Sequence, residues 1–229
     1  MYQYVKRFFD IVLSLVAIVV LSPVLLLLAI LIKTDSKGPV LFKQKRVGKD
    51  KTHFEILKFR TMYADVPKDV PTHLLADPES KITKIGKFLR KSSLDELPQI
   101  FNIFKGEMSI IGPRPALWNQ FDLIAERDKY GANDVRPGLT GLAQIMGRDE
   151  LPIDIKAKYD GDYVKDVSFK NDLKIFLEQS QVFSKLMASK KADSKIKAKA
   201  SLAEFHPNLL FLFWNNRLFR CYRLFWLFC

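Results

Sequence analysis

The feature that most constrains the fold is an uncharged run from Ile11 to Ile32. Its 22 residues include only two polar side chains, Ser14 and Ser22. As one helix the run is about 33 Å long, enough to cross the hydrocarbon core of a bilayer. It is too long for the apolar region of a signal peptide and has no cleavage site after it. It also lacks the polar face of helices in soluble proteins, so we expect a membrane segment.

Ser22 and Pro23 lie in the middle of this run. Proline removes a backbone donor and clashes with the preceding turn, so we expect a kink or a break that leaves two halves of about 17 Å. Both flanks of the run are basic, and basic flanks favour the cytoplasmic side of a membrane. A re-entrant helix that enters and leaves the same leaflet satisfies both flanks. An ordinary spanning helix with a tolerated proline kink is the alternative, and the residues do not separate the two.

The formal net charge of +12 lies in two blocks. Residues 33–60 carry nine basic and three acidic side chains, and residues 185–229 carry nine and two, whereas residues 61–184 are nearly neutral with 17 and 19. A strongly basic chain suggests a phosphate-bearing partner. Because the first block directly follows the membrane run, we interpret it as a surface that faces anionic headgroups, and we expect no nucleic acid partner.

Beyond the membrane run, the sequence predicts an α+β fold that is mostly helical. Short β-type runs on both sides of residues 47–50 predict a hairpin within residues 39–62. Helical spacing predicts an amphipathic helix over 81–91, either on the membrane surface or in the core. Further helices are expected over 94–104, 116–130, 152–165 and 169–187, the last with Ser168 as its N-cap. Residues 63–80, 111–115 and 136–141 are expected to be loops.

The last part of the chain has a different composition. Residues 188–200 are rich in Lys, Ala and Ser, which is typical of a solvated extension. Residues 205–229 hold nine aromatic side chains and three arginines. This pattern suits either an interfacial helix or an aberrant, non-native tail. The two cysteines, Cys221 and Cys229, exclude a disulfide-dense secreted scaffold.

Two adjacent carboxylates, Asp95 and Glu96, stand at the predicted start of the 94–104 helix. The helix dipole favours anions and phosphates there. Neighbouring side chains on a helix point about 100° apart, so one carboxylate can do chemistry while the other binds a metal. Arg90, one turn earlier, is placed to bind a phosphate. Taken alone, the cluster is better explained as ordinary acidic decoration of a helix start.

Five short motifs follow the membrane run in a fixed order. They are Lys58-Phe59-Arg60-Thr61-Met62, Ser93-Leu94-Asp95-Glu96-Leu97-Pro98, Gly112-Pro113-Arg114-Pro115, Arg136-Pro137-Gly138-Leu139-Thr140-Gly141 and Gly147-Arg148. With Ser22-Pro23, this order resembles the bacterial monotopic phosphoglycosyl transferases, also called polyprenyl-phosphate sugar transferases. The resemblance covers roughly residues 4–187. The chain looks like the minimal catalytic form of the family, because no further spanning helix precedes the re-entrant one.

The resemblance implies transfer of a sugar 1-phosphate from a UDP-sugar to a polyprenyl phosphate such as undecaprenyl phosphate, which releases UMP. This would be the first membrane step of surface glycan assembly. Asp95 is implied as the nucleophile that forms a covalent phosphosugar. We expect Mg²⁺ to neutralise the diphosphate, with Glu96 as its ligand or a positioning group, although which of the two carboxylates holds the metal stays open. The expected phosphate-binding residues are Lys58, Arg90 and Arg114. Arg136 and Arg148 are weaker candidates for binding the uridine diphosphate part, and Asp160 matches a recurrent acidic position of the family and is a candidate to hold metal or substrate. For Arg136 and Asp160, a salt bridge that orders a loop is an equal alternative.

These expectations divide the chain into a re-entrant membrane helix-hairpin (1–36), a cytoplasmic catalytic domain (37–187) and a tail (188–229). The location implied is the bacterial cytoplasmic membrane, with the catalytic domain on its cytoplasmic face. Neither the sugar nor the oligomeric state is indicated, and a homo-oligomer is possible. Two other functions stay open: a membrane-anchored basic protein that binds lipid or nucleic acid, and a family member inactivated by its tail.

Overall fold

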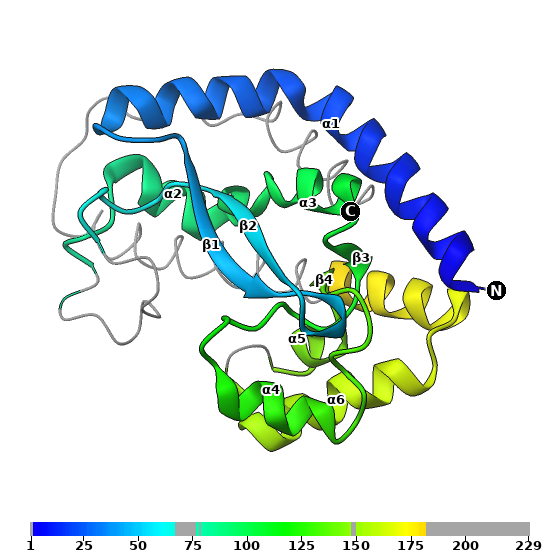
Figure 1. Cartoon of the computed structure of the whole chain (residues 1–229). Coiled ribbons are helices and arrows are strands. Elements are labelled where there is room, and N and C mark those ends of the chain that lie inside the picture. The colour runs from blue at the N-terminus through cyan, green and yellow to red at the C-terminus, as the bar shows by residue number, and fades with distance from the viewer. Residues whose placement is uncertain (1, 67–76, 78, 148–149, 182–229) are drawn as a thin grey trace, which may run out of the picture.

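A long helix, α1 (Tyr2–Asp35), arches over one side of a domain of shorter helices and two small sheets (Figure 1). The computed structural model describes residues 2–66, 77, 79–147 and 150–181. Arg148 and the whole predicted tail, 188–229, lie outside these residues. The expected mixture of helix and strand with helix predominating is confirmed.

One narrow stripe of α1 is buried against the rest of the domain. Its members recur at helical spacing and are Asp10, Ser14, Ala17, Leu21, Leu28 and Ile32. The remaining surface is apolar and open: Val19, Val20 and Leu26 are 65%, 61% and 64% exposed. By length and composition, α1 is able to cross a membrane. So large an exposed apolar surface is typical of a helix that contacts lipid.

The backbone of α1 stays helical through Pro23, so of the two expected effects of the proline, the break into two helices does not occur. Figure 1 shows that α1 bends rather than running straight. Proline has no N–H, which leaves the carbonyl of Val19, four residues earlier, without its helical donor. The Ser22 hydroxyl donates to that carbonyl at 2.8 Å. The Ser22-Pro23 pair therefore bends the helix and also satisfies the group that the proline orphans.

The predicted hairpin is confirmed. Strands β1 (Leu41–Val47) and β2 (His53–Phe59) pair antiparallel and are joined by a 3-10 turn, η1 (Lys49–Lys51). Phe59 at the end of β2 packs in one buried cluster with residues of α1 and of the helices that follow. The other members that define this cluster are Ala17, Leu21, Leu28, Ile32, Leu89, Leu97 and Ile100. The membrane helix and the end of β2 thus share one core.

Helix α2 (Lys84–Ser92) confirms the predicted 81–91 helix, but the next prediction is wrong in detail. Residues 94–104 do not form one α-helix: a 3-10 turn, η3 (Leu94–Glu96), precedes α3 (Gln99–Lys105). Pro98 cannot donate to the carbonyl of Leu94, so the chain makes three-residue hydrogen bonds here, including Leu97 N–H to Leu94 O at 3.3 Å. The two carboxylates consequently lie in the 3-10 turn, not in the first turn of the helix.

Two short strands were not predicted: one ends at the first residue of the predicted loop 111–115, and the other lies within the predicted loop 136–141. Strands β3 (Ser109–Ile111) and β4 (Gly138–Thr140) pair in parallel. The pairing continues past β3: Gly112 N–H donates to Thr140 O at 2.8 Å, and Gly138 N–H donates to Pro113 O at 2.8 Å. A Cβ on Gly138 would lie 2.1 Å from the Gly112 nitrogen, so glycine is required for this close approach. Strands of three residues are too short to show a period in the sequence.

The remaining helices are α4 (Phe121–Asp128), α5 (Leu142–Met146), α6 (Ile153–Lys165) and a helix over 169–181. The predictions for 152–165 and for the Ser168 N-cap hold, since Ser168 Oγ accepts from Asn171 N–H at 3.2 Å. The prediction of helix over 116–130 is too long. Ala116 O accepts from Val47 N–H at 3.0 Å, so contact with β1 holds residues 116–117 outside a helix, and a turn closed by Gln120 N–H to Leu117 O at 3.1 Å precedes α4. Helix α5 was not predicted.

Gly86 lies where α2 packs against the chain just after β2. A Cβ at Gly86 would lie 2.0 Å from the carbonyl oxygen of Thr61, a backbone atom that cannot rotate away. We expect Gly86→Ala to lower the free energy of unfolding by about 2 kcal/mol or more, the cost of overpacking. Thermal or denaturant unfolding measures the difference.

Lys87→Ala, the next residue on the same helix, is the matched control. Its side chain is exposed, and we expect it to change the free energy of unfolding by less than about 0.5 kcal/mol. Equal stability of the Gly86→Ala and Lys87→Ala proteins would contradict the close packing of α2 on the chain after β2.

Candidate active site

Glu96 lies between two cations that come from distant parts of the chain. Its Oε1 accepts from Lys58 Nζ at 2.7 Å and from Arg114 Nη2 at 3.1 Å. Lys58 is in β2, Glu96 is in η3, and Arg114 follows β3. The side chains of Lys58 and Glu96 are only 18% and 24% exposed, so the ion pair is partly shielded from water. Three of the five motifs therefore meet at one carboxylate oxygen.

The backbone on both sides of Arg114 is held in place. Pro113 O accepts from Gly138 N–H at 2.8 Å, and Pro115 O accepts from Arg46 Nη1 at 3.0 Å. The two prolines themselves restrict the backbone torsions. Arg114 is thus presented to Glu96 on a segment that loses little further entropy when it binds a ligand.

The two neighbouring carboxylates differ in acidity. Burial raises the pKa of Asp95, and the charge of Glu96 raises it further, to about 6, against the opposing charges of Lys58 and Arg90. Burial also raises the pKa of Glu96, but the charges and hydrogen bonds of Lys58 and Arg114 outweigh this and place it well below the ordinary value. Glu96 is therefore ionised at every physiological pH, whereas Asp95 titrates near neutrality.

Arg90 is held beside the carboxylates by a residue that the sequence did not single out. Arg90 Nε donates to Thr61 Oγ1 at 2.9 Å. Helix α2 is followed by Ser93, whose left-handed backbone (φ 57°) turns the chain directly into η3. Arg90 and Asp95 are thereby brought within electrostatic reach of each other. Thr61 belongs to the first of the five motifs, so its place in that motif was the available signal.

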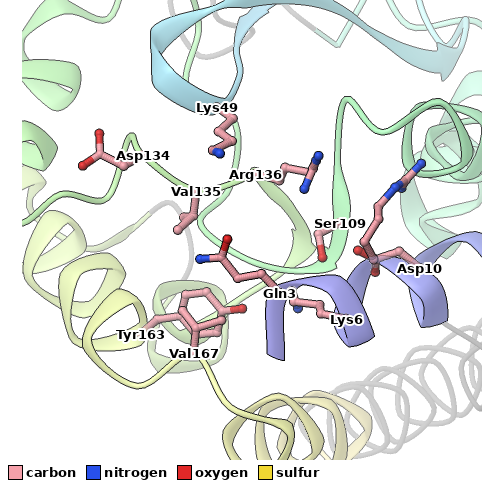
Figure 2. Close-up of a pocket in the computed structure, with 11 residues that line it drawn as sticks. Gln3, Lys6, Asp10, Lys49, Ser109, Asp134, Val135, Arg136, Tyr163 and Val167 are labelled. Atoms are coloured by element: carbon pink, nitrogen blue, oxygen red, sulfur yellow. The ribbon is translucent and has the colours of Figure 1, made fainter. Parts of the chain in front are cut away.

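Arg136 contacts a different part of the fold. Its Nε donates to Gly106 O at 2.9 Å, at the C-terminal end of α3, whereas Asp95 and Glu96 precede the other end of that helix. A seven-residue helix separates its ends by about 10 Å. Figure 2 shows Arg136 lining a cavity with Asp10 of α1 and Ser109 of β3. The structure does not bring Arg136 into the contact between Lys58, Glu96 and Arg114.

Asp160 makes a buried ion pair. Its Oδ2 accepts from Arg127 Nε at 2.8 Å and from Arg127 Nη2 at 2.6 Å, and the two side chains are 1% and 4% exposed. The pair ties α6 to α4. Its recorded contact is thus the ordering salt bridge that the sequence offered as an alternative, and a role toward metal or substrate stays a prediction. Of the predicted site residues, the structure gathers Lys58, Arg90, Asp95, Glu96 and Arg114.

The carboxylates suit a magnesium ion that takes most of its ligands from substrate. Among the described residues, no three acidic, histidine or cysteine side chains form a group able to hold a metal by itself. Mg²⁺ typically takes one or two protein carboxylates and completes its shell with phosphate oxygens and water. Both hydrogen bonds that we describe at Glu96 end on Oε1. Glu96 Oε2 and the carboxylate of Asp95 therefore fit this incomplete ligand set.

A carboxylate with a raised pKa, beside an ionised one paired with two cations that suit phosphate, is an arrangement compatible with group transfer at phosphorus. The comparison with known families identifies a transferase family. The family described as bacterial sugar transferase matches residues 1–185. The chain belongs to this family, which confirms the resemblance found in the motifs.

Three curated relatives carry more specific names. The UDP-N-acetylgalactosamine–undecaprenyl-phosphate N-acetylgalactosaminephosphotransferase of Aeromonas hydrophila is 40% identical over 180 residues, 76% of this chain and 42% of that protein. The undecaprenyl-phosphate galactose phosphotransferase of Salmonella typhimurium is 34% identical over 194 residues, 79% of this chain and 40% of that protein. The exopolysaccharide production protein ExoY of Sinorhizobium fredii is 35% identical over 184 residues, 74% of this chain and 81% of that protein. The chain spans about two fifths of the length of the first two relatives.

Proposed function

We propose that the protein transfers a sugar 1-phosphate from a UDP-sugar to a polyprenyl phosphate, undecaprenyl phosphate in bacteria, through a phosphosugar bound covalently to Asp95. The products are a polyprenyl-diphosphate sugar and UMP. The names of the relatives support this reaction, since two of them act with undecaprenyl phosphate. Those two names specify different sugars at 40% and 34% identity, so similarity leaves the sugar open.

The observation that carries the proposal is the contrast between Asp95 and Glu96. A nucleophilic carboxylate must be ionised at working pH and yet reactive, and a pKa of about 6 satisfies both needs. Glu96 supplies a fixed negative charge that Lys58 and Arg114 neutralise. Lys58 and Arg114 are also the side chains that we propose to compensate the charge of the bound diphosphate.

In the first step, an oxygen of the Asp95 carboxylate attacks the β-phosphorus of the UDP-sugar. A P–O bond forms to Asp95, and the bond between the β-phosphorus and the bridging oxygen breaks, so UMP leaves with the bonding electrons. Lys58, Arg90 and Arg114 would hold phosphate oxygens and offset the charge that builds up at phosphorus. Mg²⁺, bound by Glu96 and Asp95 with substrate oxygens, would supply further charge neutralisation.

In the second step, an oxygen of the lipid phosphate attacks the same phosphorus and releases the Asp95 carboxylate. This step needs a lipid substrate at the site. An apolar helix in the membrane would keep the site close to that lipid. The cluster that contains Leu28 and Ile32 of α1 also contains Leu97, the residue that follows the two carboxylates. We propose that α1 is re-entrant and that it places the catalytic domain at the cytoplasmic face, where a soluble nucleotide sugar and a lipid phosphate meet.

Removal of the nucleophile is the direct test. We expect Asp95→Asn to reduce UMP release with undecaprenyl phosphate by at least about 1,000-fold, because the amide cannot form the acyl phosphate. With a UDP-sugar labelled in the sugar and no lipid acceptor, the wild-type protein should retain label after acid quenching, and the variant should retain none. A screen of UDP-sugars for UMP release identifies the donor.

Asp122→Asn, an exposed aspartate on α4, is the matched control and should keep wild-type activity. Full turnover by Asp95→Asn would exclude the covalent mechanism.

The pH dependence follows from the raised pKa of Asp95. Because only the ionised carboxylate attacks, the rate of UMP release should fall as the pH drops through about 6. The Glu96→Gln substitution removes a negative charge that raises this pKa, so the midpoint of its residual activity should move to lower pH. Initial rates measured between about pH 5 and 8 test both statements. An unchanged midpoint in Glu96→Gln would contradict the coupling of the two carboxylates.

The topology of α1 is tested by cysteine labelling. Cys221 and Cys229 are replaced by serine, and single cysteines are introduced for the exposed residues Tyr4 and Lys37. If α1 is re-entrant, an impermeant maleimide should label neither position in intact cells and both after lysis. Labelling of one position alone in intact cells would place the two flanks on opposite faces and identify a spanning helix.

A further inference from the structure

Arg60 is a buried cation that the proposed chemistry does not use. It follows β2 and is only 5% exposed. A buried guanidinium is costly unless its N–H groups are hydrogen-bonded and its charge is compensated. The groups that accept hydrogen bonds from Arg60 therefore indicate which part of the fold it stabilises.

The guanidinium of Arg60 holds the end of α1. Nη1 donates to Lys37 O at 2.6 Å, and Nη2 donates to Ser36 O at 2.8 Å and to Ile32 O at 3.4 Å. These carbonyls lie in and just beyond the last turn of α1, where a helix lacks donors and carries partial negative charge. One side chain thus caps the C-terminal end of the apolar helix through both Nη atoms, whereas its buried Nε has no hydrogen-bond partner among the described residues.

Residues on both sides of Arg60 make hydrogen bonds to side chains of the candidate site. Two residues earlier, Lys58 donates to Glu96, and one residue later, Thr61 accepts from Arg90. The backbone of the same segment is paired, since Arg60 N–H donates to Val40 O at 2.9 Å and Thr83 N–H donates to Thr61 O at 3.0 Å. Because Lys58 and Arg60 are separated by about 7 Å of extended chain, movement at one is transmitted to the other.

A second contact connects the same turn of α1 to the site. Asp35 Oδ2 accepts from Ile85 N–H at 3.2 Å, in the first turn of α2, and the last turn of α2 carries Arg90. The end of α1 is therefore joined to Lys58 through β2 and to Arg90 through α2.

We infer that Arg60 is a positioning residue: it fixes the end of α1 to the segment that carries Lys58 and Thr61, and so sets the position of Lys58 at Glu96. Through this contact, the depth at which α1 inserts also determines the height of the carboxylates above the membrane. The inference rests on the proposed function for its kinetic readout, and it concerns a residue that touches neither substrate nor the reacting atoms.

A double-mutant cycle in lipid nanodiscs tests it. We expect Arg60→Met and Lys58→Met each to lower kcat/KM for UMP release by about tenfold or more, and the double variant to fall no more than about threefold below the worse single variant. Arg60→Lys keeps one donor toward the carbonyls and should recover part of the loss. If the fold loss in kcat/KM of the double variant equals the product of the two single losses, the residues act independently and the inference is overturned.

Ile175→Ala is the control for a general loss of stability, because Ile175 is buried on the 169–181 helix in a separate cluster. In the folded fraction of the protein, the fold loss in kcat/KM caused by Ile175→Ala should multiply with the loss caused by Arg60→Met. If Arg60→Met does not fold, Arg60→Lys takes its place in both cycles. Coupling of Arg60 to Ile175 as strong as that to Lys58 would reduce Arg60 to a structural role.

Hydrogen–deuterium exchange provides a readout that needs no substrate. In Arg60→Lys, amides of residues 94–97 should exchange faster than in the wild type, whereas those of 169–181 should not change. If no UDP-sugar supports UMP release by the wild-type protein, the proposed function fails and the exchange experiment still decides the inference. Unchanged exchange at 94–97 would overturn it.

Discussion

Lys58 and Arg114 donate to the same oxygen of Glu96, and this three-way contact holds together segments that are 38 and 18 residues apart from Glu96 in the chain. Partly buried charges are costly when unpaired, so the Glu96 carboxylate stabilises both cations and both cations stabilise the carboxylate. The contact closes the end of the hairpin onto η3 and onto the loop after β3. It also creates the neighbouring environment of Asp95, whose acidity depends on the charge of Glu96 beside it. A structural ion pair at Glu96 thus sets the acidity of Asp95, the carboxylate that we propose to react.

The apolar helix is connected to the rest of the domain by polar contacts at both ends, and of these contacts only those at its C-terminal end lead to this site. Near its start, Asp10 Oδ1 accepts from Ile110 N–H at 3.0 Å in β3, and Arg7 Nη1 donates to Ile103 O at 2.6 Å at the end of α3. At its other end, Arg60 and Ile85 meet the last turn. Directional bonds at two ends fix both the rotation and the height of a helix, which apolar packing alone does not. The surface that faces away stays apolar and suits lipid.

The motifs indicated Lys58, Asp95, Glu96 and Arg114, and its place one turn before the carboxylates indicated Arg90, because the diphosphate that we propose as substrate needs cations and carboxylates in one place. They were less informative for Arg136 and Asp160, whose charges contact a helix end and a buried arginine. A charged residue in a short motif has the same appearance whether it binds substrate or orders a loop. The contacts of Thr61, Arg60 and Asp35 could not be predicted either, although the first two lie in a motif, since each contact involves a partner at least 23 residues away in the chain.

The sequence by itself determined the long apolar helix, its bend at Pro23, the hairpin, most helices and the family, because these depend on local composition and on the order of short motifs. Tertiary structure decided where η3 ends and α3 begins, that the loops 111–115 and 136–141 pair through β3 and β4, and which carboxylate titrates near neutrality. The first two depend on which backbone groups find partners across the fold. The third depends on burial and on charges brought from three separate segments, and neither exists before the chain has folded.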